Sequence, residues 1–179
     1  MRQSLLHQAL RLHPDSPCAA TTRIEVDIAR PRPGSLILSY VVSGRISDLR
    51  LPPVVTAARA DELWQHTCFE AFLRPSVGPR YYEFNFSPST QWAAYQFNGY
   101  RSGMRVATEI GAPRIEVRSN AETCTLRTAL QIDGLSCPLQ LGLAAVLEET
   151  NGRKSYWALA HPPGNADFHH ADCFALELS

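Results

Sequence analysis

Two short runs of alternating residues hold the side chains best suited to binding a small ligand. LWQHTCFEAFL begins at Leu63, and YYEFNFS begins at Tyr81 after a loop that contains proline and glycine. In a pleated strand, alternate side chains point to the same face, so each run gathers its polar and aromatic groups on one side. The candidate ligand-binding residues of that face are Trp64, His66, Glu70, Glu83 and Asn85.

These residue types favour a saccharide as the ligand. An aromatic ring packs against the apolar C–H patches of a pyranose, while carboxylates and amides hydrogen-bond to its hydroxyl groups. Trp64, Trp92 and Trp157 could supply the aromatic surface. The alternative is that the tryptophans are ordinary core or rim residues and that the polar side of the two runs is a solvated sheet face.

The opposite side of the two runs is apolar and is predicted to enter the core. If the hairpin is centred between Ser76 and Val77, Glu70 lies directly opposite Glu83, a pairing of like charges that destabilises a sheet. The pairing could shift by two residues, one glutamate could take a proton, or a ligand or arginine could lie between them. The sequence leaves these alternatives open. The predicted core residues of the hairpin are Phe69, Ala71, Leu73, Tyr82, Phe84 and Phe86.

A second group of potential ligands lies near the end of the chain, in HPPGNADFHHAD. A metal ion could be held there, although adjacent histidines in an extended chain point in opposite directions. The alternative is a hydrogen-bonded loop that fixes the last strand. The candidate metal ligands are His161, Asp167, His169 and Asp172.

Motifs of common enzyme classes are absent from the sequence. It holds no G-x-S-x-G, no phosphate-binding loop and no H-E-x-x-H. Glu70 and Glu83 at cross-strand distance would suit a retaining glycosidase, whose two carboxyl groups lie about 5 Å apart. Such a pair on a flat sheet lacks the cleft that catalysis needs, so a non-catalytic binding domain is expected.

Composition excludes several classes of partner. The chain has 179 residues, 45% apolar and 19% charged, which is typical of one globular domain spanning residues 1–179. Its 17 basic residues balance its 17 acidic ones, so neither nucleic acid nor an anionic membrane surface is an expected partner. No apolar run approaches the roughly 18 residues that a membrane span needs.

The cysteines and the N-terminal residues indicate a cytoplasmic protein. Five cysteines are widely spaced and include no C-x-x-C pair, which argues against a thiolate zinc site and favours reduced thiols. The first residues contain His, Gln and Arg among their leucines, unlike a secretory signal.

Alternation with a period of two dominates the chain and predicts an all-β fold. About ten short strands with turn signals between them favour a single antiparallel β-sandwich. Residues 45–61 have no sustained period and are expected to form a long connection, whereas Asn151-Gly152 predicts a tight hairpin turn. The predicted strands span residues 5–12, 23–29, 35–42, 91–97, 114–118, 123–132, 138–148, 155–161 and 173–178, together with the two runs described above.

The pattern W-x5-E in LWQHTCFEAFL, the run YYEFNFSPS and the terminal HHADCFALEL resemble the DOMON-like domains, a group related to carbohydrate-binding module family 9. The resemblance implies a jelly-roll-like β-sandwich, as found in bacterial relatives. Sugar-binding relatives clamp the ligand between two tryptophans and use a glutamate six residues after the first. By that resemblance Trp64 and Glu70 would bind the sugar, with Trp157 as the second tryptophan and Asn85 as a polar partner.

Two other functions remain open beside saccharide binding. Some relatives bind heme for electron transfer, and Met104 is the internal methionine that could serve as an axial ligand with His66, His161 or Lys154. The sheet face could also dock a partner protein.

Overall fold

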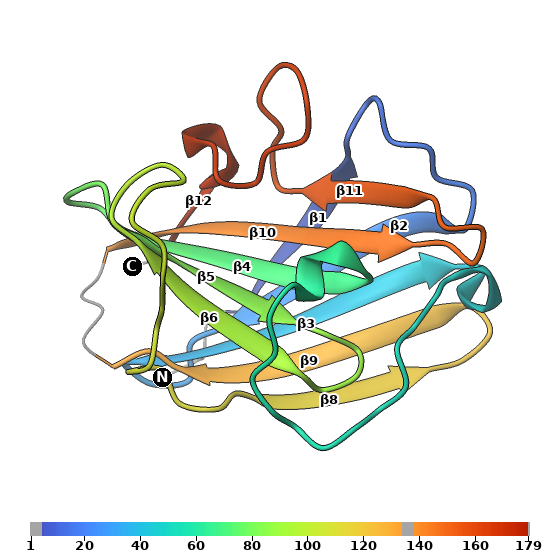
Figure 1. Ribbon diagram of the computed structural model, residues 1–179, viewed down its shortest axis with the longest axis horizontal. Helices are drawn as coiled ribbons and strands as arrows, with labels where there is room; N and C mark the ends of the chain where they lie inside the picture. The colour runs from blue at the N-terminus through green and yellow to red at the C-terminus, as the bar shows by residue number, and fades with distance from the viewer. Residues whose placement is uncertain (1–4, 134–137, 179) are drawn as a thin grey trace.

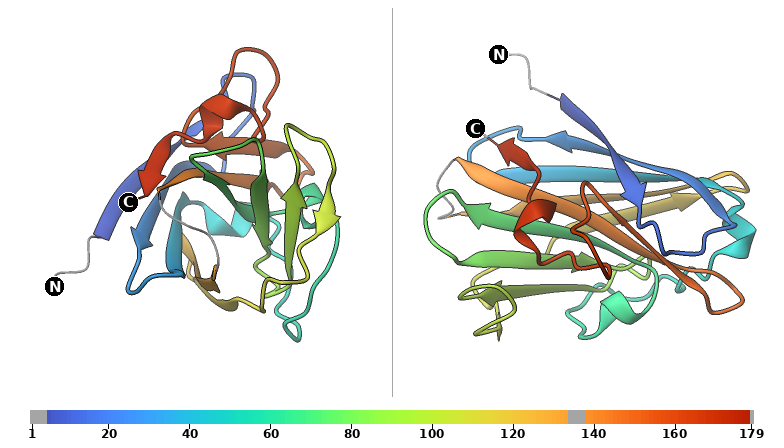
Figure 2. Two further views of the ribbon diagram at one scale, coloured as in Figure 1. Left: turned by 90° about the vertical axis from the view of Figure 1, so that its left-hand side faces the viewer. Right: turned by 90° about the horizontal axis from the view of Figure 1, so that it is seen from above.

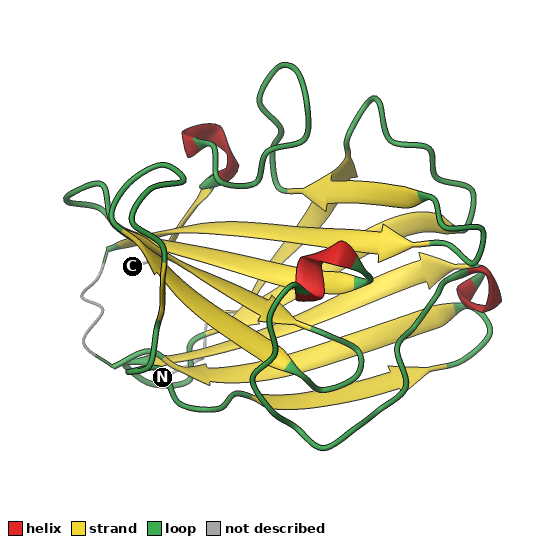
Figure 3. Cartoon of the chain, in the orientation of Figure 1, coloured by secondary structure: helices red, strands yellow, loops and turns green. Residues whose placement is uncertain are grey.

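The computed structural model describes residues 5–133 and 138–178, which form two layers of antiparallel strands (Figures 1 and 3). One layer has the order β1-β2-β3-β9-β8 and the other the order β7-β6-β5-β4-β10-β11, with β12 also pairing with β10. The strands of the first layer are β1 (Leu5–Leu12), β2 (Thr21–Ala29), β3 (Ser35–Gly44), β8 (Arg114–Ser119) and β9 (Thr123–Gln131). Those of the second are β4 (Cys68–Pro75), β5 (Tyr81–Phe86), β6 (Trp92–Phe97), β7 (Arg105–Val106), β10 (Leu139–Glu148), β11 (Lys154–Ala158) and β12 (Leu176–Leu178).

Strand β1 joins the two layers. Its residues from Leu5 to Leu10 pair with β2, whereas Arg11 and Leu12 pair with β11. The sheet therefore curls over at β1, and the end-on view in Figure 2 shows its two halves facing each other. The all-β antiparallel sandwich predicted from the alternation is confirmed.

The main core lies between the layers and follows the predicted alternation. In β2, Ile24, Val26 and Ile28 are buried, and their neighbours in sequence are more exposed. Because a period of two matches the pleat, each such strand presents one apolar side to the opposite layer. The inward residues of β9 and the residue after it are all buried, namely Cys124, Leu126, Thr128, Leu130 and Ile132.

The connections also agree with most of the turn signals. The long connection after β3 contains only the short 3-10 turns η1 (Ile46–Asp48) and η2 (Leu63–Gln65). Strands β10 and β11 form the predicted hairpin, in which Gly152 takes a positive φ of 84° that glycine adopts without strain. Among the described residues, no helix has the length and apolarity to cross a bilayer. The described cysteines, Cys18, Cys68, Cys124 and Cys173, are free thiols, and Cys137 lies outside the described residues.

The last predicted strand is shorter than expected. Residues Ala171–Cys173 form a 3-10 turn, η3, and β12 begins only at Leu176. Leu178 enters the main core, but Phe174 packs on the opposite side of the second layer. A regular strand over residues 173–178 would turn Phe174 inward together with Leu178. Phe174 does not point inward because the chain at η3 lies over the sheet and does not pair within it.

Candidate functional site

The second layer is apolar on both faces, which makes its outer face unusual for a sheet at a protein surface. The inner face contributes Phe69, Phe84 and Trp157 to the main core. The outer face carries a separate apolar cluster that is covered by other segments of the chain. That cluster is formed by Phe72, Tyr81, Ala93, Tyr95, Phe97, Ala144, Val146, Ala158, Phe168 and Phe174.

Two segments cover the outer face. The turn η2 contacts β4 and β5 and adds Leu63 to the outer cluster (Figure 3). The segment between β11 and β12, red in Figure 1, contributes Phe168 and Phe174. It lies so close to β10 that a Cβ at Gly142 would be 3.0 Å from the carbonyl oxygen of Cys173. The outer face is therefore an enclosed layer.

The hairpin of β4 and β5 forms as predicted, but with a different register. Glu70 lies opposite Asn85, and Phe72 lies opposite Glu83. The predicted pairing of Glu70 with Glu83 is wrong by two residues, a shift that keeps the same faces inward and outward. It removes the direct opposition of like charges and leaves the two glutamates as diagonal neighbours on one face.

Glu70, Glu83 and Asn85 come together on this face and are almost completely buried. Their exposed fractions are 3%, 6% and 0%. The Asn85 Nδ2 donates to Glu83 Oε1 at 2.9 Å. In contrast, Glu70 Oε1 and Asn85 Oδ1 have no hydrogen-bond partner among the described residues. Two buried acceptor oxygens are thus left without donors, an arrangement that costs free energy unless something binds there.

Burial shifts the titration of both carboxyl groups. It raises the pKa of Glu70 well above its usual range, and the charge of Glu83 raises it further. Burial also raises the pKa of Glu83, against the opposing effects of the Asn85 hydrogen bond and the Arg101 charge. Because the charged form is penalised in each case, the pair favours holding a proton. The register shift, one of the three predicted ways to relieve the Glu70–Glu83 conflict, is therefore present, and the raised pKa of both carboxyl groups favours protonation, the second way.

His169 is the residue of the C-terminal loop that reaches the site. Its ring packs edge-on against Phe72 and Phe97, its Nδ1 is 2.8 Å from the Tyr81 hydroxyl, and its Nε2 is 3.6 Å from Glu83 Oε2. Burial lowers the pKa of His169 to about 4, so the imidazole is neutral near pH 7. Sequence analysis proposed it only as a metal ligand.

Tyr81 and Tyr95 were missed as site residues, although a signal for them exists. Tyr81 shares the strand parity of Glu83 and Asn85, and Tyr95 lies opposite Glu83 on β6. The Tyr95 hydroxyl donates to Asp61 Oδ1 at 2.7 Å. The alternation of side chains along β5 alone would have placed Tyr81 on the same face as Glu83. The position of Tyr95 beside Glu83 depends on the pairing of β5 with β6.

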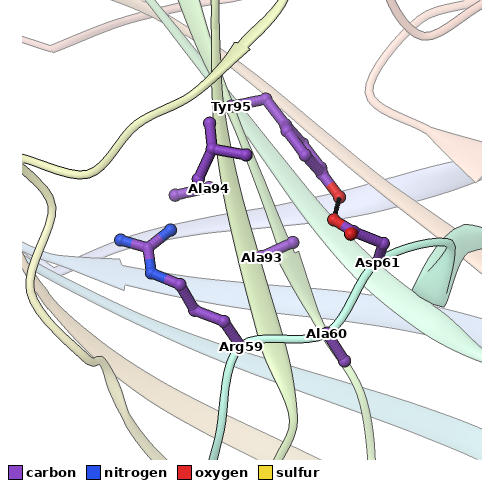
Figure 4. A pocket seen from close by; sticks show the side chains of 7 residues that line it. Arg59, Ala60, Asp61, Ala93, Ala94 and Tyr95 are labelled. Atoms are coloured by element: carbon purple, nitrogen blue, oxygen red, sulfur yellow. Dashed lines mark hydrogen bonds between the residues drawn. The ribbon is translucent and has the colours of Figure 1, made fainter.

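A cavity of about 160 Å³ opens at the edge of β6 (Figure 4). It is lined by Ala93 and Tyr95, which lie directly opposite Asn85 and Glu83 on β5, and by Asp61. Figure 4 shows Arg59 on the other side of β6 from the Tyr95–Asp61 hydrogen bond. The cavity wall at Ala93 is therefore one strand away from Asn85. The remaining lining residues are Ala60, Ala94 and Val106.

The tryptophans occupy different positions from those predicted. Trp64 is 52% exposed and belongs to η2, not to the strand that carries Glu70. Trp157 is 5% exposed in the main core, where its Nε1 donates to Ser155 Oγ at 3.0 Å. The prediction that Trp157 forms the second side of a clamp is wrong, since its strand turns that side chain to the inner face. Trp92 is also a core residue.

His66 lies near the site but is bound elsewhere. It follows η2, and its Nδ1 is 2.7 Å from Glu148 Oε2 at the end of β10. It therefore orders the entry to β4 and does not contact Glu70 or Asn85 through any hydrogen bond of the described residues.

The other metal candidates do not converge. Within residues 5–133 and 138–178, no three His, Cys, Asp or Glu side chains gather around a common point. Asp167 binds Tyr100 and Arg101, while His161 Nε2 is 2.8 Å from the Arg11 carbonyl oxygen. Asp172 lies at η3, where its backbone N–H donates to His170. Met104, the heme-ligand candidate, has an exposed side chain, and heme binding stays a prediction.

Comparisons with known proteins identify the fold. No protein-family model matches the sequence, and no curated protein matches it. A proposed carbohydrate-binding protein from Bacteroides uniformis is similar in structure, with a TM-score of 0.62 and 16% identity over 94% of this chain and 84% of that chain. A carbohydrate-binding module of family 9 from Caldicellulosiruptor kristjanssonii, solved with cellotriose, gives a TM-score of 0.53 and 10% identity over 90% of this chain and 75% of that chain. At these identities the likeness shows a common fold, and the chain shares its β-sandwich with a family 9 carbohydrate-binding module.

Proposed function

We propose that the outer face of β4, β5 and β6 binds a saccharide without catalysing a reaction. The observation that carries the proposal is the pair of buried, unpartnered acceptors, Glu70 Oε1 and Asn85 Oδ1. Sugar hydroxyl groups are donors that would satisfy both oxygens. Their hydrogen bonds would offset the free-energy cost of burying these two oxygens without donors. The fold shared with the cellotriose-binding module supports the same ligand class.

Aromatic and small residues around the acids fit this ligand. The cavity at the β6 edge gives access beside Ala93 and Tyr95. Trp64 belongs to η2, which contacts β4 and β5, and is more than half exposed, so its ring is free to pack on the apolar face of a sugar. The site is thus formed by one exposed aromatic residue and a buried polar floor.

Calorimetric titration with glucose and cellotriose tests the proposal. The wild-type protein should bind at least one of them, and Glu70→Leu, which removes the unpartnered oxygen, should lower the affinity about tenfold or more. Thr128→Val is the matched control, because Thr128 Oγ1 is also buried and unpartnered but lies on β9 in the main core. Equal sugar binding by the wild type and Glu70→Leu would disprove the site.

Tryptophan fluorescence supplies an independent reading. Trp92 and Trp157 are buried in the core, so a sugar at the rim should change chiefly the emission of Trp64. The change should vanish in Trp64→Phe. A signal that persists in that variant would place the binding sugar away from Trp64.

A further inference from the structure

The outer face holds buried acceptor oxygens that have no donor. Glu70 Oε1 and Asn85 Oδ1 are unpartnered, and Glu83 Oε2 has only His169 Nε2 at 3.6 Å. Two donor groups nearby already have an acceptor, since one N–H of Asn85 Nδ2 donates to Glu83 and the Tyr95 hydroxyl donates to Asp61. A ligand group with several donors and no lone pair of its own would fit this face best.

A hydroxyl group meets that requirement less well than an ammonium group. A hydroxyl donates one hydrogen but brings two lone pairs, which would then need donors that the face does not supply. An ammonium group has three donors and no acceptor. Glu70, Asn85 and Glu83 together present three acceptor groups, two carboxyl groups and one amide oxygen, that an ammonium group could use.

The charges on the face point to the same chemistry. Two carboxyl groups, Glu70 and Glu83, share it, and no ion pair to Glu70 exists among the described residues. The nearest cations are held by other groups. Arg101 pairs with Asp167, and Arg59 stacks on Trp92 while donating to the carbonyl oxygens of Ala107 and Ile110.

The cavity at the β6 edge has an acidic group on the side that carries Tyr95. Asp61 lines the cavity, and Ala93 in its wall lies opposite Asn85 on β5. Arg59 also lines the cavity, with its guanidinium over the Trp92 ring, and it lies on the other side of β6 from Asp61 (Figure 4). A cationic group in this cavity would therefore meet Asp61 on the side of Tyr95.

We propose that the ligand of this face is an amino sugar, whose free ammonium group lies between Glu70, Asn85 and Glu83. This inference rests on the proposed function, since it specifies the saccharide that the same site takes. The site is therefore expected to bind free amino sugars more tightly than neutral hexoses or N-acetylated sugars. The amide of an N-acetylated sugar has neither the charge nor the three donors of an ammonium group.

Calorimetric titration of the wild-type protein with glucosamine, glucose, N-acetylglucosamine and propylamine tests the inference. Glucosamine should bind about tenfold or more tightly than glucose and N-acetylglucosamine, because charged hydrogen bonds are the stronger ones. Propylamine, which carries the ammonium without the ring, should bind more weakly than glucosamine. Glucose binding as tight as glucosamine binding would overturn the amino-sugar inference and leave the proposed function intact. Binding of no sugar at all would overturn both.

The substitution Glu70→Gln distinguishes a need for the negative charge of Glu70 from a need for an acceptor oxygen. Glu70→Gln keeps an acceptor oxygen and removes the carboxylate, so it should weaken glucosamine about tenfold more than it weakens glucose. Thr128→Val should leave the ratio of the two affinities unchanged. If Glu70→Gln lowers both affinities by the same factor, the ammonium group does not bind at Glu70 and the inference is wrong.

Discussion

Two pairs of buried glutamates in the second layer differ in whether their oxygens find partners. Glu148 is the last residue of β10 and Glu149 follows it, and each is about 95% buried. Glu148 binds Arg50 at 2.9 Å and His66 at 2.7 Å. Glu149 Oε1 accepts the backbone N–H groups of residues 19 and 20 at 2.8 and 3.0 Å. This pair ties a loop and the start of β4 to the end of β10.

The pair on the outer face has no comparable support. Glu70 accepts no side-chain or backbone donor at Oε1, and Glu83 relies on Asn85. Backbone donors lower the pKa of Glu149, whereas burial raises that of Glu70. A buried acid with partners stabilises a fold, and one without them destabilises it. We infer that Glu148 and Glu149 serve stability, and the contrast supports the proposal that Glu70 and Glu83 bind a ligand.

The largest stability effect is expected at the supported pair. Glu149→Leu leaves the buried N–H of Ala20 without an acceptor and should lower the free energy of unfolding by about 1–3 kcal/mol. Urea denaturation measures the change. Sugar affinity, measured on the folded variant, should stay at the wild-type value, and a loss of affinity would break the distinction between the two pairs.

At Glu70, whose Oε1 has no partner, the free energy of unfolding is expected to change in the opposite direction. Glu70→Leu removes a buried group that has an unpartnered oxygen, so it should raise the free energy of unfolding by about 1 kcal/mol. The same urea titration applies, with Thr128→Val as the companion variant. Destabilisation by Glu70→Leu would mean that Glu70 supports the fold in the way that Glu149 does.

The pH dependence of the two variants should also be opposite. The pKa of Glu70 is raised in the folded protein. Its favourable contribution to the free energy of unfolding is therefore fully present below the usual pKa of 4.5 and is lost as the pH rises through the folded pKa. The advantage of Glu70→Leu over the wild type should therefore grow from pH 4 to pH 8. The lowered pKa of Glu149 gives stability that is present above 4.5 and is lost in acid, so the cost of Glu149→Leu should shrink below that pH. Parallel pH profiles for the two variants would contradict the assignment.

The smallest stability effect is expected at the rim. Trp64→Ala removes a half-exposed side chain and should change the free energy of unfolding by less than about 0.5 kcal/mol. It should nevertheless weaken sugar binding, because the ring is the proposed aromatic surface of the site. Leu5→Ala, at a similarly exposed position on β1, is the control and should alter neither quantity.

Strands with one buried face could be predicted from the sequence, as β2 and β9 illustrate. Their period of two reports directly which side chains meet the opposite layer. Strand β11 could not be read in the same way, since both of its faces are covered and Tyr156, Trp157 and Ala158 are all apolar. Without alternation in β11, the inward position of Trp157 could not be predicted from local sequence.

The candidate site was partly predictable for a similar reason. Parity in β4 and β5 correctly grouped Glu70, Glu83 and Asn85 on one face. The register depended on how the loop after β4 is built, and the approach of His169 depended on a covering segment distant in sequence. Neither is encoded in local periodicity. The DOMON-like resemblance stays a prediction beside the fold likeness.

A crystal structure of the protein with glucosamine bound would locate the ligand directly. We expect the ligand on the outer face of β4 and β5, with donor atoms within about 3.2 Å of Glu70 Oε1 and Asn85 Oδ1. A sugar bound elsewhere on the molecule, with both oxygens still unpartnered, would contradict this expectation.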